Sequence, residues 1–227
     1  MFYLFANWKS HNNLSQTREW FGTFINNLDK SSRNALENEQ MMVVIFPQAP
    51  LTYPLHTLCM GEVGISVGFQ DISPLDEGKY TGLVNASSAE GIANFVIVGH
   101  VEQRQRGDSI EIVAQKYKQA LNHGIRPVLC ISKIEQIIQD AQIIAFEPIE
   151  AIGSGHNALM SEISNFKKSL NRPKSIFIYG GSVDETNCVQ YIDSGLVDGL
   201  LIGTVSLDAI RFSTLVNACA SYVNTKD

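Results

Sequence analysis

Eight short and almost uninterrupted apolar segments recur along the chain, and they constrain its fold more than any other feature. They occupy residues 2–6, 41–46, 64–68, 95–98, 127–131, 142–146, 175–179 and 197–202. Continuous apolar runs are typical of parallel strands that are covered on both faces. Apolar residues that return every three or four positions predict helices between them, over 15–28, 108–123, 160–170, 184–194 and 207–223. Eight strand-and-helix units in 227 residues predict an α/β fold of the (β/α)8 barrel type, in preference to a doubly wound sheet.

Local signals predict where several helices begin and end. Ser15 and Asp184 are candidate N-caps, and Gly124 and Gly195 stand where a helix would stop. Residues 132–146 must also hold the sixth strand. We therefore expect one short helix at most after the fifth strand.

Composition excludes several classes of partner. Asp and Glu total 23 against 17 Lys and Arg, a net charge of −6, and no segment forms a basic stripe, so neither nucleic acid nor an anionic membrane is expected as a partner. The apolar runs are far shorter than the roughly 20 residues that cross a bilayer, and the first residues lack the basic start of a secretory signal. The protein is expected to be cytoplasmic. Without a linker or a repeat, the chain is interpreted as one domain over residues 1–227.

The cysteines are widely separated and have no spacing typical of zinc or redox chemistry. They are Cys59, Cys130, Cys188 and Cys219. We expect buried free thiols.

In a barrel of this kind, function lies just after the carboxyl ends of the strands. Asn7 and Lys9 follow the first strand and point to the same side of an extended segment, where they could bind an anion or form a solvated turn. His100 follows the fourth strand, where the start of a helix would lower the pKa of the imidazole and favour a neutral hydrogen-bond donor. A purely structural histidine is the alternative. Glu147 follows the sixth strand, where burial would raise the pKa of the carboxyl toward that of a general base; capping the next helix is the alternative.

Glycine-rich segments follow the last three strands. Residues 148–155 have proline at one end and glycines at the other, which is typical of a closing lid. Gly180, Gly181 and Ser182 follow the seventh strand, and Gly203 and Thr204 follow the eighth. Glycine lets the backbone approach a ligand, and N–H groups at a helix start bind phosphate. Either loop alone could be an ordinary turn.

With these residues assembled, the sequence resembles the triosephosphate isomerase family along nearly its whole length. The resemblance depends on five motifs in the family's order: Asn7-Trp8-Lys9, Gly99-His100 with Glu102, Phe146-Glu147-Pro148 with 151–155, Tyr179-Gly180-Gly181-Ser182, and Leu201-Ile202-Gly203. It implies a TIM barrel and an aldose–ketose isomerase that needs neither a metal nor an organic cofactor.

The resemblance also implies residue roles. Glu147 would be the base that moves a proton between the two carbons of dihydroxyacetone phosphate and glyceraldehyde 3-phosphate. Neutral His100 would polarise the carbonyl group and move protons between the oxygens of the enediolate. Lys9 would supply positive charge for the enediolate and the phosphate, and Asn7 a hydrogen bond at the reacting oxygen, with Glu102 and Tyr179 in support. Backbone N–H groups would hold the phosphate, at Gly153, Ser182, Gly203 and Thr204.

The segment Gly78–Gly82 is similar to the tip of the family's third loop, which inserts into a neighbouring subunit. A homodimer is therefore implied, with a tetramer as the alternative. Gln103 and Leu83 stand where the family has an arginine and a glutamate that interact near the interface. Losing both avoids a stranded charge.

Other positions depart from the family pattern close to the site. Val101 replaces a serine whose hydroxyl bonds the base carboxylate while the lid is open. Lys133 and Glu150 replace a glutamate and a tryptophan that meet, which suggests an ion pair. Thr204 replaces a glycine, and it would be strained if the site needs a positive φ.

Three other functions have weaker support in the sequence. Residues 153–158 fit the G-x-G-x-x-A pattern of dinucleotide binding, but the acidic residue expected after the next strand is replaced by Tyr179-Gly180-Gly181. A barrel that binds phosphate without catalysis is the main alternative. A metal hydrolase is disfavoured because the five histidines form no helical ligand pair.

Overall fold

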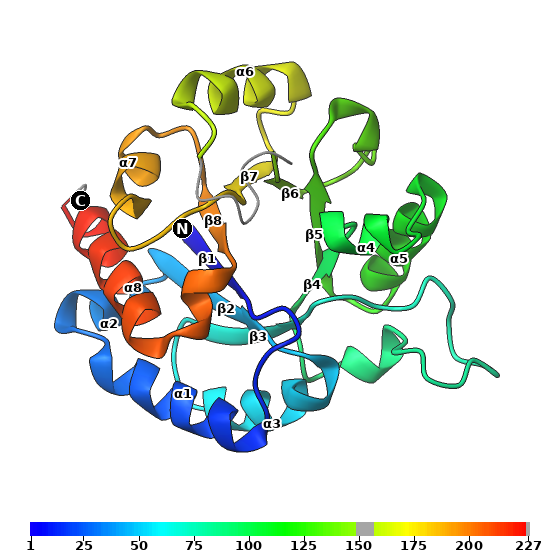
Figure 1. The fold of residues 1–227 in the computed structure, drawn as a ribbon, viewed down its shortest axis with the longest axis horizontal. Helices are drawn as coiled ribbons and strands as arrows, with labels where there is room; N and C mark the ends of the chain where they lie inside the picture. Colours follow the sequence, from blue (N-terminus) through cyan, green and yellow to red (C-terminus); the bar gives the residue numbers. More distant parts are fainter. Residues whose placement is uncertain (149–156, 226–227) are drawn as a thin grey trace.

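Eight parallel strands close into a barrel in the computed structural model, which describes residues 1–148 and 157–225 (Figure 1). The strands are β1 (Phe2–Asn7), β2 (Met41–Phe46), β3 (Ile65–Phe69), β4 (Phe95–Val98), β5 (Arg126–Ile131), β6 (Ile143–Phe146), β7 (Ile176–Tyr179) and β8 (Gly199–Ile202). Each strand pairs with the next, and β8 returns to β1, where Leu201 lies opposite Phe5. The predicted (β/α)8 barrel is confirmed, and every predicted strand forms within two residues of its expected ends.

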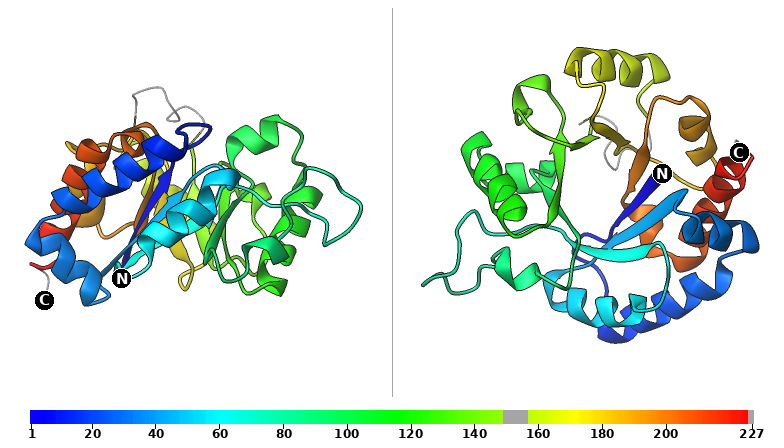
Figure 2. Two further views of the ribbon diagram at one scale, coloured as in Figure 1. Left: turned by 90° about the horizontal axis from the view of Figure 1, so that it is seen from below. Right: turned by 180° about the vertical axis from the view of Figure 1, so that it is seen from behind.

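Helices surround this barrel on the outside (Figures 1 and 2). They are α1 (Leu14–Asn27), α2 (Lys30–Glu37), α3 (Ala49–Cys59), α4 (Val101–Gln105), α5 (Ile110–Asn122), α6 (Met160–Leu170), α7 (Cys188–Asp193) and α8 (Ala209–Val223), with the 3-10 turns η1 (Ser87–Ala89), η2 (Ile134–Gln136) and η4 (Thr204–Leu207). All five predicted helices form, although α7 is shorter than expected. In the described residues, no helix is long and apolar enough to cross a membrane.

Two predicted N-caps are placed differently by the structure. Asn13, not Ser15, caps α1, because its side chain accepts the N–H three residues later. Asp184 accepts N–H groups two and three residues later, so it caps a turn that precedes α7. Gly124 and Gly195 do end their helices, with φ of +69° and +62°, which glycine adopts without strain.

The segment after β5 is as short as predicted. Residues 132–142 contain only η2, and the side-chain oxygen of Gln136 accepts the N–H groups of Ser132 and Lys133 at 2.8 and 3.2 Å. Ile137 and Ile138 pack against the core behind this turn. A short turn therefore stands where most other units have a longer outer helix; the unit between β3 and β4 likewise contains only η1.

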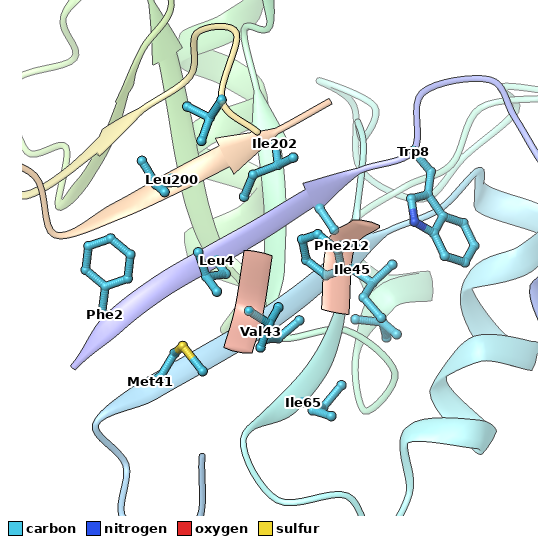
Figure 3. Packing of buried hydrophobic residues seen from close by; sticks show 14 of the residues in the cluster. Phe2, Leu4, Trp8, Met41, Val43, Ile45, Ile65, Leu200, Ile202 and Phe212 are labelled. Atoms are coloured by element: carbon cyan, nitrogen blue, oxygen red, sulfur yellow. The ribbon is translucent and has the colours of Figure 1, made fainter. Parts of the chain in front are cut away.

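Both faces of the strands are buried, which explains the continuous apolar runs. Phe5, Phe46 and Phe95 fill the inside of the barrel with rings in contact. The alternate residues of β1 and its neighbours face outward, and Leu4 packs in the layer that includes Phe212 of α8 (Figure 3). Burying each such side chain contributes roughly 1.5–3 kcal/mol.

All four cysteines are buried and free, as predicted. Cys130 lies inside the barrel. The thiol of Cys188 in α7 donates to the carbonyl oxygen of Leu215 in α8 at 4.0 Å, a contact that their spacing along the chain does not indicate.

Candidate active site

The carboxyl ends of the strands bring most of the predicted site residues together. Asn7 is the last residue of β1, and Glu147 directly follows β6. One cavity of about 220 Å3 is lined by Asn7, Lys9, His100, Glu147, Ser182, Gly203 and Thr204, together with residues not predicted for the site. Asn7, His100 and Glu147 are each at most 6% exposed. Gly153 lies outside the described residues.

His100 is held at both ring nitrogens. It is the N-cap of α4, and its Nδ1 accepts the N–H of Glu102 at 3.2 Å. Nδ1 therefore carries no proton, and Nε2–H points at Oε1 of Glu147, 3.1 Å away. Burial lowers the pKa of the imidazole, but the charge and hydrogen bond of Glu147 outweigh it and place the pKa above its ordinary value. The predicted lowering by the helix start is thus outweighed by the carboxylate.

The Glu147 carboxylate has further partners. Its Oε2 accepts the backbone N–H of Val101 at 3.3 Å. Burial, together with the negative charge of this carboxylate, raises the pKa of the Cys130 thiol, so the thiol stays protonated. A Cβ on Gly180 would lie 3.1 Å from Glu147 Cγ, so glycine leaves room for the Glu147 side chain. The main chain of Val101 thus supplies a donor to the Glu147 carboxylate, the contact that the resemblance assigns to a serine hydroxyl.

Lys9 adopts a strained backbone conformation, with φ of +50°. Its N–H donates to Asn7 Oδ1 at 3.1 Å, and Gln70 Nε2 donates to its carbonyl oxygen at 2.7 Å, which together hold this conformation. Its Nζ bonds Glu102 Oε1 at 2.6 Å. Burial raises the pKa of Glu102, but the hydrogen bond and charge of Lys9 outweigh it, and the carboxyl pKa falls below its ordinary value.

The two predicted phosphate loops lie beside these groups. A Cβ built on Gly203 would be 3.6 Å from Lys9 Cε. Thr204 begins η4 and is not among the residues with positive φ, so the predicted strain is absent. Tyr179 Oη accepts the N–H of Ala158 at 3.0 Å, and a Cβ on Gly181 would collide with that hydroxyl.

The remaining predictions near the site have mixed outcomes. Glu150, the predicted ion-pair partner of Lys133, lies outside the described residues. The predicted lid beyond Pro148 also lies outside them. Cys130 and Gln70 were not predicted as site residues. The inward-facing position of Cys130 on β5 could have indicated that it lies near the site. Gln70 follows β3 and contacts Lys9, which follows β1, and no pattern in the neighbouring sequence predicts that contact.

Chemically, the cavity combines a buried carboxylate, an imidazole N–H and a lysine. Such a set can remove a proton from a carbon next to a carbonyl group and stabilise the negative charge that develops on the oxygen. Within residues 1–148 and 157–225, no cluster of three or more His, Cys, Asp or Glu side chains is arranged to hold a metal ion.

Fold and site together define a (β/α)8-barrel enzyme with a candidate acid–base centre. The family model described as triosephosphate isomerase matches residues 2–219, and the chain belongs to that family. It is 31% identical to a triosephosphate isomerase of Coxiella burnetii, over 94% of this chain and 95% of the relative. The corresponding values are 29%, 93% and 96% for those of Thermus thermophilus and Aquifex aeolicus. Its relatives are thus isomerases, and this chain is an isomerase as well.

Proposed function

We propose that this protein interconverts dihydroxyacetone phosphate and glyceraldehyde 3-phosphate. The observation that carries the proposal is the buried contact of Glu147 with His100 Nε2 in a cavity that Lys9 also lines. Glu147 removes a proton from the carbon beside the carbonyl group and returns it to the neighbouring carbon. His100 donates from Nε2 to the oxygen that becomes negative, and Lys9 and Asn7 stabilise that charge.

Burial supports the role of Glu147. The side chain is 5% exposed, so little water competes for the carboxylate, and a substrate carbon would replace the imidazole at Oε1. His100 keeps its proton on Nε2 because Nδ1 accepts a backbone N–H. The N–H groups of Ser182, Gly203 and Thr204, with that of Gly153, are proposed to hold the phosphate.

The test is isomerisation of glyceraldehyde 3-phosphate, coupled to reduction of dihydroxyacetone phosphate. Glu147→Gln keeps the shape of the side chain and removes the base, so kcat should fall by about 10²–10⁴-fold. Glu37→Gln, an exposed site at the end of α2, is the matched control and should turn over like the native protein. Turnover that survives Glu147→Gln would refute the proposed base. No turnover in a folded protein that binds phosphate would favour the binding barrel instead.

We also propose that the protein is a homodimer that works in cytoplasmic glycolysis. The segment between β3 and η1 projects from the barrel (Figure 1), and it exposes Tyr80 and Leu83 by 46% and 53%. A second cavity, of about 610 Å3, lies beside the site and is lined by Lys9, Glu102 and Leu83 among others. A mass from light scattering tests the dimer, and a monomer at micromolar concentration would refute it.

A further inference from the structure

Arg211 occupies a position that helix electrostatics disfavour. It is the third residue of α8, and its N–H donates to the N-cap Asp208 at 3.1 Å. The first turn of a helix carries partial positive charge, so a cation there is destabilising unless acidic groups oppose it. Helix formation therefore gives no reason for arginine at this position.

Glu185 fixes the guanidinium in place. Arg211 Nε and Nη2 donate to the two carboxylate oxygens of Glu185 at 2.8 and 3.0 Å. This two-bond geometry orients the planar group more strictly than a single contact would. The hydrogen bond from Arg211 also holds the pKa of Glu185 below its ordinary value.

The cavity that holds Glu147 and His100 is also lined by Arg211. Among its described lining residues, the cations are Lys9 and Arg211 and the carboxylates are Glu147 and Asp184. Both cations are also paired with a carboxylate outside this lining, Lys9 with Glu102 at 2.6 Å and Arg211 with Glu185 at 2.8 Å, so the two carboxylates of the lining are opposed by two cations. Without Arg211, a phosphate dianion would enter a cavity whose remaining charges favour its exclusion.

We propose that Arg211, oriented by Glu185, is a specificity-determining residue for the phosphate group at this site. The inference rests on the proposed function and deepens it. Arg211 stands beside the loops of Ser182 and Thr204, and it offsets the negative charge of Asp184. Because substrate and transition state carry the same phosphate, the residue acts on KM and leaves kcat nearly unchanged.

The experiment compares Arg211→Gln with Arg33→Gln. Arg33 is an exposed arginine of α2 that does not line the cavity, so both variants lose one positive charge. Two quantities are measured at low salt: KM for glyceraldehyde 3-phosphate, and the Kd of inorganic phosphate by calorimetry. Arg211→Gln should raise both by about fivefold, with kcat within about twofold, because the guanidinium is half-exposed and screened by water. Arg33→Gln should change neither.

Arg211→Lys separates charge from geometry. It keeps the cation but loses the two-bond contact with Glu185, and both constants should fall between those of the native protein and Arg211→Gln. If Arg211→Gln behaves like Arg33→Gln in both measurements, Arg211 only balances the acidic groups around it and the proposal is wrong. A native protein without turnover that binds phosphate more tightly than Arg211→Gln would refute the isomerase and leave this inference standing. If the native protein turns over and Arg211→Gln leaves KM and the phosphate Kd unchanged, the isomerase stands and this inference is refuted.

Discussion

Lys116 of α5 is a buried cation whose removal should destabilise the fold more than its helix position suggests. Its Nζ bonds both carboxylate oxygens of Asp71 at 2.7 and 2.8 Å, and one of Asp108 at 2.7 Å. The Lys116 side chain is 6% exposed, whereas those of Asp71 and Asp108 are 27% and 13% exposed. The cluster ties the segment after β3 to the start and middle of α5.

The change Lys116→Met keeps most of the aliphatic stem and strands two carboxylates. Removing one partner of a buried ion pair costs about 3–5 kcal/mol. Because water reaches both carboxylates, we expect the lower end, about 3 kcal/mol, which lowers Tm by roughly 6–12 °C in a protein of this size. Thermal unfolding followed by circular dichroism measures the loss.

Two comparisons isolate the charge. Lys118→Met changes an exposed lysine of the same helix, and it should alter stability by less than about 0.5 kcal/mol. Adding Asp71→Asn and Asp108→Asn to Lys116→Met should restore most of the stability, because no carboxylate is then stranded. If Lys116→Met is no less stable than Lys118→Met, or if the triple variant recovers nothing, the charge argument is wrong.

The pH dependence gives an independent check. Burial raises the pKa of Asp71 in the folded protein, against the lowering effect of Lys116. A carboxyl whose folded pKa is raised contributes stability at low pH that is lost as pH increases through that pKa. Without Lys116 that lowering effect is gone. The difference in the free energy of unfolding between the native protein and Lys116→Met should therefore shrink as pH is lowered from 7 to about 4.

Three further changes test local features. Gly181→Ala places a Cβ against the Tyr179 hydroxyl, so Tm should fall by the few degrees that correspond to about 1–3 kcal/mol, and kcat/KM should fall with it. Glu90 raises the pKa of His123 by a hydrogen bond, so His123→Gln should remove up to about 1 kcal/mol of stability that the native protein has at pH 6 and loses toward pH 8, as Tm values would show. Asn13→Ala removes the cap of α1 and should cost about 1 kcal/mol in urea unfolding, whereas Ser15→Ala should cost much less.

The barrel could be predicted because each strand must be apolar on both faces, a requirement that is written locally in the sequence. Leu4 and Phe5 illustrate it, since one packs under the helices and the other fills the barrel. The start of α1 was placed at Ser15 because several polar residues near a helix start can cap it. Only the backbone geometry selects Asn13.

The candidate site was predictable where a residue directly follows a strand, as Glu147 does. It was not predictable where the contact depends on register between strands or on distant segments. Gln70 bonds the carbonyl oxygen of Lys9 across 61 residues, and Arg211 bonds Glu185 across 26. The predicted lowering of the His100 pKa was wrong for the same reason. The effect of the α4 start can be predicted from the neighbouring sequence, whereas the Glu147 carboxylate that outweighs it comes from the end of β6.

Val101 illustrates how a main-chain group can supply a contact near the candidate site without a polar side chain. Val101 is the first residue of α4, and N–H groups at a helix start have no partner inside the helix. Its N–H therefore remains available to Glu147 Oε2, whichever side chain the residue carries. Position 101 can lose a hydroxyl because the main chain supplies a donor. Glu147, as the proposed base, has no such replacement, since no backbone group can accept a proton from carbon at that place.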